Sequence, residues 1–152
     1  MSLLHTFGPF LWDSRLGAPT AEATADRCLS TMPPAEAQDL KGKIAIVTGC
    51  TLGGIGAVTA SVLAGKAKMR VVLVGRTMAK LEKTAERIEE DYPEAQVIPM
   101  TCDVSLLSSV RAFVGAFEGR FPAADFELAL LVNNAGIMAA PYATTPEGFE
   151  TQ

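Results

Sequence analysis

The fold of this chain is decided by Thr48-Gly49-Cys50-Thr51-Leu52-Gly53-Gly54-Ile55-Gly56, a glycine-rich stretch that follows a continuous apolar run. That run, residues 44–47 (Ile-Ala-Ile-Val), is typical of a parallel strand covered on both faces. A helix is predicted directly after the stretch, so the glycines lie in a turn between a buried strand and a helix start. Four apolar residues at helical spacing form the predicted inward face of that helix: Ile55, Val58, Val62 and Leu63.

A strand–turn–helix of this kind is a common site for the pyrophosphate of a dinucleotide. Glycine lets the backbone turn sharply and approach phosphates, and the helix start offers N–H groups and a positive dipole end. Gly49 and Gly54 also match the first part of a nucleoside-triphosphate loop, but Ile55-Gly56 replaces the Lys-Ser/Thr pair which that loop needs. The alternative is that the glycines only permit close strand–helix packing. The cofactor contacts predicted in the turn are Gly49, Thr51, Gly53, Gly54, Ile55 and Gly56.

The rest of the chain alternates between strand and helix patterns. Further strands are predicted at residues 71–74, 96–101 and 128–132, and Pro99 suggests that the second of these lies at a sheet edge. Ser105 suits the N-cap of the helix before the last strand. The predicted inward residues are Met78, Leu81, Ala85 and Ile88 in one helix and Val110, Phe113, Val114 and Phe117 in the next. This alternation predicts an α/β fold, a Rossmann-type parallel sheet with helices on both faces, truncated after the fourth strand.

The residue that follows the second predicted strand bears on the choice of cofactor. A dinucleotide site places there the group that reads the adenosine ribose, and an acid at that point favours NAD. This chain has Gly75-Arg76-Thr77, and an arginine can pair with a 2′-phosphate and stack on adenine. Arg76 therefore favours NADP over NAD, with an ordinary exposed arginine as the alternative.

Three blocks of sequence resemble the short-chain dehydrogenase/reductase family, and together they span about Lys41 to Gln152. Thr48 to Gly56 resembles the phosphate loop of the family, and Asp103-Val104 resembles its adenine-contacting acid. Residues 133–136 resemble the block that steadies the fourth strand beside the cofactor, and residues 130–138 are similar to retinol-dehydrogenase-like members. The resemblance implies hydride transfer between a nicotinamide cofactor and a carbonyl or alcohol substrate. It adds these predicted cofactor contacts: Asp103, Val104, Asn133, Asn134, Ala135 and Gly136.

The chain departs from the family pattern in its phosphate loop. Four residues, Cys50 to Gly53, separate Gly49 from Gly54. The loop is therefore one residue longer than the Thr-Gly-x-x-x-Gly-x-Gly pattern of the family. Cys50 is predicted to be a small filler residue, and the alternative is a redox role, because the pKa of a thiol can fall close to a helix start.

A second departure concerns the reaction itself. The family reaction uses a Tyr-x-x-x-Lys pair, whereas Tyr92 and Tyr142 are followed four residues later by Gln96 and Pro146. No catalytic residue is therefore assigned. The resemblance implies an NADP-dependent oxidoreductase, and these residues alone are expected to be inactive. Two alternatives remain: a non-catalytic module that binds NADP or another protein, and an incomplete gene product.

Composition favours a globular protein and excludes several function classes. Of the 152 residues, 49% are hydrophobic and 20% are charged. The net charge of −4 does not indicate the basic surface that binds nucleic acid. No apolar run approaches the length of a membrane-spanning helix. One histidine and three separated cysteines predict neither a metal site nor a disulfide framework. A reducing, cytoplasmic location is expected, with a peripheral-membrane or organellar one as the alternative.

The domain organisation follows from these patterns. Residues 1–40, rich in proline and alanine and with an apolar run at residues 3–12, are predicted to be a flexible extension. Residues 41–152 are predicted to be the dinucleotide-binding half of a Rossmann domain. If residues 128–132 formed an open sheet edge, that apolar strand would favour self-association or a homo-oligomer.

Overall fold

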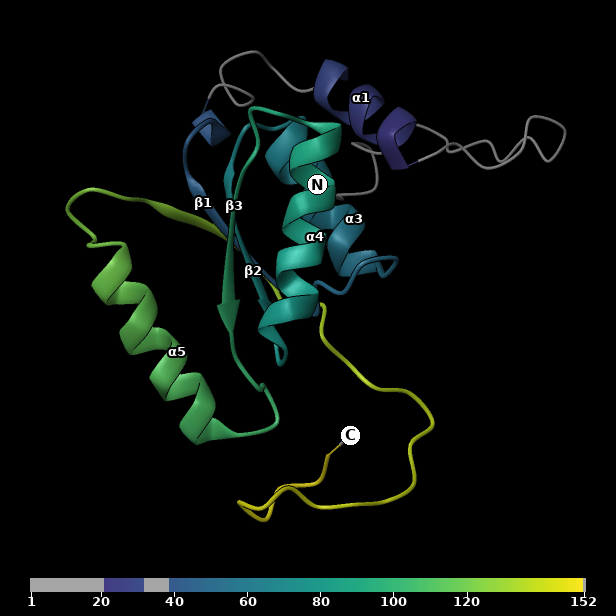
Figure 1. Cartoon of the computed structure of the whole chain (residues 1–152), viewed down its shortest axis with the longest axis vertical. Helices are drawn as coiled ribbons and strands as arrows, with labels where there is room; N and C mark the ends of the chain where they lie inside the picture. Colours follow the sequence, from purple (N-terminus) through teal and green to yellow (C-terminus); the bar gives the residue numbers. More distant parts are fainter. Residues whose placement is uncertain (1–20, 32–38, 152) are drawn as a thin grey trace, which may run out of the picture.

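A four-stranded parallel sheet forms the centre of the chain (Figure 1), which we describe from a computed structural model for residues 21–31 and 39–151. The strands lie in the order β3-β2-β1-β4. Their bounds are β1 Ile44–Thr48, β2 Arg70–Gly75, β3 Gln96–Thr101 and β4 Leu128–Val132. The predicted Rossmann-type parallel sheet is confirmed, and Pro99 does lie on an edge strand, β3.

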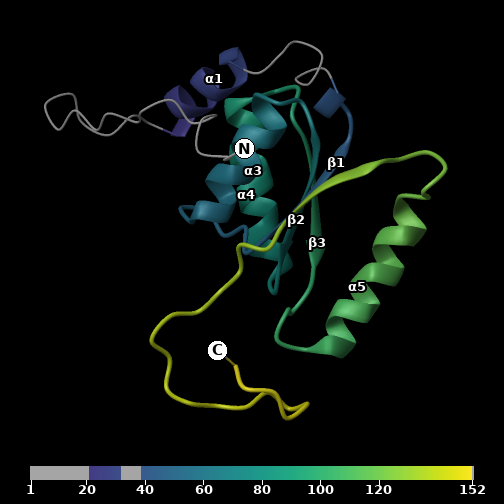
Figure 2. The same cartoon turned by 180° about the vertical axis from the view of Figure 1, so that it is seen from behind.

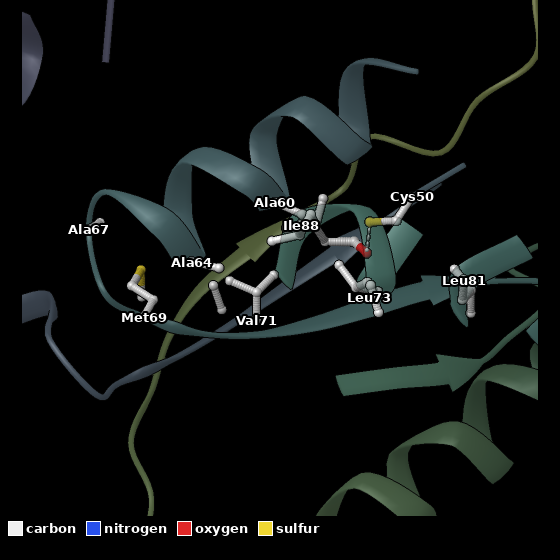
Figure 3. Close-up of a cluster of buried hydrophobic side chains, with 12 residues drawn as sticks. Cys50, Ala60, Ala64, Ala67, Met69, Val71, Leu73, Leu81 and Ile88 are labelled. Carbon is white, nitrogen blue, oxygen red and sulfur yellow. Dashed lines mark hydrogen bonds between the residues drawn. The ribbon is translucent and has the colours of Figure 1, made fainter. Parts of the chain in front are cut away.

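Helices cover both faces of this sheet, as Figure 2 shows from the opposite side. Helices α3 (Ile55–Gly65) and α4 (Met78–Asp91) lie on one face, and α5 (Leu107–Arg120) lies on the other. Alternate strand residues divide between the two cores because successive side chains of a strand point to opposite faces. Val71 and Leu73 pack with α3 and α4 (Figure 3), whereas Val72 and Val74 pack toward the phenylalanines of α5.

The inward face of α3 differs from the prediction. Ile55 is 80% exposed and Val58 is also exposed, whereas the alanines of the helix are buried: Ala57, Ala60 and Ala64. Small side chains let the helix backbone lie close to β1 and β2, which leaves no room there for branched residues. The same correction applies at two other predicted inward positions, Met78 and Val114, since both side chains are exposed.

Part of the predicted extension is a helix, α1 (Ala21–Thr31), which packs against α3. Ala25 is buried, Leu29 joins the core beneath α3, and Asp26 forms an ion pair with Lys66 at 2.9 Å. This helix was not predicted from the sequence, and the flexibility of residues 1–40 stays a prediction. The apolar run at residues 3–12 lies outside the described residues, as do the rest of residues 1–20 and residues 32–38.

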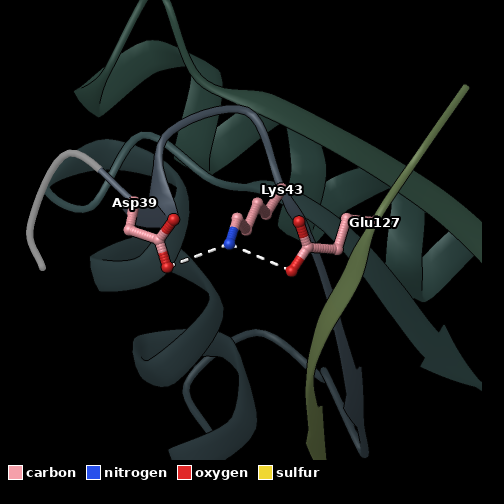
Figure 4. A network of polar contacts seen from close by, with 3 residues as sticks. All are labelled: Asp39, Lys43 and Glu127. Carbon is pink, nitrogen blue, oxygen red and sulfur yellow. Dashed lines mark ion pairs between the residues drawn. The ribbon is translucent and has the colours of Figure 1, made fainter.

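An ion-pair network joins the amino-terminal ends of β1 and β4 (Figure 4). The Lys43 Nζ lies 2.9 Å from an Asp39 carboxylate oxygen and 3.0 Å from one of Glu127. Hydrogen bonds to Asp39 and Glu127 raise the pKa of Lys43. The network lies at the end of the sheet opposite the cleft described below. Within the described part of the chain, no helix has both the length and the apolar character to span a membrane.

Strand β4 forms the second edge of the sheet. Leu131 is 55% exposed, and Leu128 and Leu130 are exposed too, whereas every residue of the neighbouring β1 is buried. A parallel strand composed only of apolar residues is usually covered on both faces. Strand β4 is therefore an uncovered apolar edge in the described structure.

Candidate functional site

A cleft of about 640 Å³ opens at the carboxyl ends of the four strands. Its walls come from the ends of β1 to β4 and from the connections that follow them. It is lined by Thr48, Gly49, Thr51, Val74, Gly75, Arg76, Cys102, Asp103, Val104, Ser105, Asn134, Ala135, Gly136, Ile137 and Thr151. The chain runs from β1 outward to β3 and then returns to place β4 on the other side of β1. In open α/β sheets such a switch point, at the carboxyl ends of the strands, is where ligands bind.

The floor of the cleft is held by hydrogen bonds between the ends of β1 and β4. The Thr48 hydroxyl accepts the backbone N–H groups of Asn134 at 3.0 Å and Ala135 at 2.9 Å, and it donates to the Val132 carbonyl at 3.3 Å. The Asn134 side-chain amide donates to the Thr48 carbonyl at 2.8 Å. Asn134 therefore fixes the end of β4 against the glycine loop, which is the role that the family resemblance implied.

The glycine loop divides into a part that faces the cleft and a part that supports it. Gly49 and Thr51 line the cleft, whereas Gly53 lines a smaller cavity of about 150 Å³ between α3 and α4. Gly56 is buried directly behind the loop, and Ile55 points into solvent. The predicted contacts Gly53, Gly54, Ile55 and Gly56 are not among the residues that line the cleft.

The longer loop is accommodated by a turn that points away from the cleft. Gly53 has a φ of +83°, a left-handed conformation that glycine adopts without strain, and Leu52 beside it is exposed. The Gly54 N–H donates to the Thr51 carbonyl at 2.9 Å and closes this turn. Thr51 to Gly54 therefore form a hydrogen-bonded turn within the longer loop.

Arg76 and Asp103 lie close enough to interact at the ends of β2 and β3. Asp103 Oδ1 accepts hydrogen bonds from the Ser105 hydroxyl at 2.7 Å and the Ser105 N–H at 3.0 Å. These bonds lower the pKa of Asp103, and the Arg76 cation lowers it further. Ser105 therefore orients Asp103 instead of capping α5 as predicted, since that helix begins at Leu107. Arg76 and Val104 are exposed at the same wall of the cleft.

The cysteines near the site are structural. Cys50 is fully buried, and its thiol donates to the Val47 carbonyl at 3.0 Å. Burial raises the pKa of Cys50 to about 11, which agrees with the predicted filler role and not with the alternative of a lowered thiol pKa. Burial also raises the pKa of Cys102. Among the described residues no group of histidine, cysteine and acidic side chains could hold a metal ion.

Several lining residues were not predicted as site residues. Three of them end a strand or follow one directly: Thr48, Gly75 and Cys102. The predicted strand ends could therefore have identified these three as lining residues. Ser105 and Ile137 adjoin predicted contacts. Thr151 reaches the cleft from a distant hairpin, for which the sequence holds no local signal. Asn133, a predicted contact, is exposed and is not a lining residue.

The fold and the cleft define a Rossmann-type nucleotide-binding protein. A family model described as short chain dehydrogenase matches residues 43–150. The chain therefore belongs to the short-chain dehydrogenase/reductase family of oxidoreductases.

Individual relatives agree with this assignment. The chain is 41% identical to human (Homo sapiens) retinol dehydrogenase 12 over 112 residues, which are 74% of this chain and 34% of that protein. It is 35% identical to the human (Homo sapiens) WW domain-containing oxidoreductase over 142 residues, 93% of this chain and 33% of that one. The chain thus spans about one third of the length of these relatives.

Solved structures show the same fold. A metagenomic short-chain oxidoreductase in complex with NADP is 35% identical, with a TM-score of 0.54 over 64% of this chain and 41% of that one. L-Sorbose reductase from Gluconobacter frateurii, complexed with NADPH and L-sorbose, is 29% identical, with a TM-score of 0.55 over 72% of this chain and 38% of that one.

Proposed function

We propose that this chain forms the cofactor-binding part of an NADP-dependent oxidoreductase that transfers hydride between the nicotinamide and a carbonyl or alcohol substrate. The observation that carries the proposal is the position of Arg76, exposed at the end of β2 on the wall of a cleft at the switch point of the sheet. Two similar structures are complexes with NADP and with NADPH, which supports a nicotinamide cofactor.

The residues of the cleft fit such a cofactor. Ligand pockets have volumes of roughly 300–1,000 Å³, and a cleft of about 640 Å³ lies within that range. Gly49 and Thr51 lie beside the start of α3, whose dipole favours the anionic pyrophosphate. Arg76 supplies the cation for a 2′-phosphate, and Asp103 with Val104 forms the adenine end. Asn134 holds the wall on which the nicotinamide, which supplies or accepts the hydride, would rest.

The 152 residues are proposed to bind the cofactor without completing the reaction, because no Tyr-x-x-x-Lys pair occurs among them. The test is an NADPH oxidation assay with a panel of aldehydes and ketones. We expect no turnover above the rate without protein. Turnover by these residues alone would contradict this part of the proposal. A silent assay with measurable NADPH binding agrees with the proposal and equally with its alternative, a non-catalytic module that binds NADP.

Replacing Arg76 with alanine is expected to weaken NADPH binding about tenfold, which corresponds to about 1.4 kcal/mol. NADH binding should change less than twofold, because NADH lacks the 2′-phosphate. Both dissociation constants can be measured by the fluorescence of the reduced nicotinamide. Arg87→Ala is the matched control, since Arg87 pairs with Asp91 at 2.9 Å on α4, away from the cleft. Equal losses for NADPH and NADH would contradict the assignment of Arg76.

We also propose that the apolar edge β4 causes the isolated chain to self-associate. Size-exclusion chromatography is expected to show oligomers whose fraction rises with concentration. Leu131→Lys should shift the chain toward monomer, because a charge at the edge opposes pairing with another strand. Leu107→Lys on α5 replaces another exposed leucine, 43% accessible against 55% for Leu131, away from the edge and should leave the elution unchanged. A wild-type chain that elutes as a monomer and unfolds cooperatively would contradict this proposal.

A further inference from the structure

Residues 143–151 form a small hairpin after the last strand. Thr144 and Glu150 form an antiparallel bridge, and the Thr151 N–H donates to the Ala143 carbonyl at 3.0 Å. Within the hairpin, the N–H of Thr145 donates to the Phe149 carbonyl at 2.7 Å, and the Thr145 side chain is buried. The two arms are therefore held together by their own hydrogen bonds, and Glu147 lies between them in the turn.

The Glu147 carboxylate binds the amino-terminal end of α5. Its Oε2 accepts the Leu107 N–H at 2.7 Å, and its Oε1 accepts the Ser108 N–H at 3.0 Å. The first N–H groups of a helix have no partner within the helix, and a carboxylate there also interacts favourably with the helix dipole. These bonds lower the pKa of Glu147, and the Arg111 cation on α5 lowers it further, so the carboxylate is ionised at neutral pH.

This contact joins two walls of the cleft. Figures 1 and 2 show the chain after β4 passing the carboxyl ends of the strands and returning toward the start of α5. Thr151 at the base of the hairpin and Asp103 after β3 both line the cleft. Asp103 is itself tied to α5, because its N–H donates to the Ser109 hydroxyl at 2.9 Å.

We propose that Glu147 is a positioning residue that fixes the 143–151 hairpin to α5 and thereby holds Thr151 and Asp103 at the correct separation for the nucleotide. The inference rests on the proposed function for its ligand, but the contact itself is independent of any ligand. Loss of the contact frees the hairpin, so that binding the nucleotide must also order this segment, and that ordering opposes binding.

The test compares Glu147→Ala and Glu147→Gln with the wild-type full chain, using amide hydrogen exchange and NADPH titration. Glu147→Ala should increase exchange at Leu107, at Ser108 and across residues 143–151, and should raise the dissociation constant for NADPH several-fold. Glu147→Gln keeps one acceptor oxygen and should restore part of both losses. Glu150→Gln makes the same chemical change on an arm of the same hairpin and should leave both readouts at the wild-type level.

Two results would overturn the inference: unchanged exchange in Glu147→Ala, or faster exchange with an unchanged dissociation constant for NADPH. If the wild-type chain does not bind NADPH, the proposed function is contradicted. The claim that Glu147 positions Thr151 and Asp103 for a nucleotide is then contradicted as well. The exchange comparison would still decide, in that case, whether Glu147 fixes the hairpin to α5.

Discussion

Replacing Gly56 with alanine is expected to lower the free energy of unfolding by about 3 kcal/mol, because the new carbon has no space. A Cβ at this position would lie 2.6 Å from the Asn134 Nδ2 and 2.7 Å from the Gly49 carbonyl oxygen. The second neighbour is backbone of the glycine loop, so relief requires movement of the loop itself. NADPH binding should therefore fall together with stability.

The matched control is Gly115→Ala in α5, where no atom lies within 4 Å of the added carbon. Alanine is the better helix former, and this variant should be as stable as the wild type or more stable by up to about 1 kcal/mol. Urea unfolding followed by circular dichroism measures both variants. A Gly56→Ala chain that unfolds at the wild-type midpoint would show that the loop does not pack as described.

Thr48→Val should lower the free energy of unfolding by about 1–3 kcal/mol. Valine has nearly the same shape as threonine, but it removes the hydroxyl that accepts the N–H groups of Asn134 and Ala135. The Ala135 N–H loses this partner, whereas the Asn134 N–H keeps a hydrogen bond to the Val132 carbonyl at 3.0 Å. Thr48 itself is buried, so its own side of the contact is shielded from water. The same urea experiment measures the change in stability. NMR would detect the lost hydrogen bonds to the Thr48 hydroxyl as changes in the amide proton chemical shifts of Asn134 and Ala135.

Thr101→Val is the control for this substitution. Thr101 ends the edge strand β3, which β2 separates from β1, and its side chain is exposed. The change there should stay within about 0.5 kcal/mol, as is usual for a surface substitution. Equal losses at Thr48 and Thr101 would mean that the substitution acts through strand propensity and not through the bonds that join β1 to β4.

The sheet could be predicted because its signals are local. Continuous apolar runs predicted the strands, and Pro99 predicted the edge position of β3 from the missing N–H alone. The inward face of α3 could not be predicted in this way. Helical spacing favoured Ile55 and Val58, but close packing of the helix on the sheet selects the smaller Ala60, which hydrophobicity alone ranks lower.

The candidate site was predictable where it adjoins strand ends and not where distant segments meet. Arg76, Asp103 and Asn134 follow predicted strands, and all three line one cleft. The role of Ser105 differed because the carboxylate of Asp103, two residues away, competes for its hydroxyl. The N–H groups at the start of α5 are instead bound by Glu147, forty residues along the chain from Leu107, and no local pattern encodes such a contact.

The central claim is that the cleft at the carboxyl ends of the strands binds NADP with its 2′-phosphate at Arg76. A crystal structure of the chain grown with saturating NADP tests it most directly. We predict electron density for the pyrophosphate beside Gly49 and Thr51, and for the 2′-phosphate within hydrogen-bond distance of the Arg76 guanidinium. A nucleotide bound outside this cleft, or bound in it with the 2′-phosphate turned away from Arg76, would contradict the account.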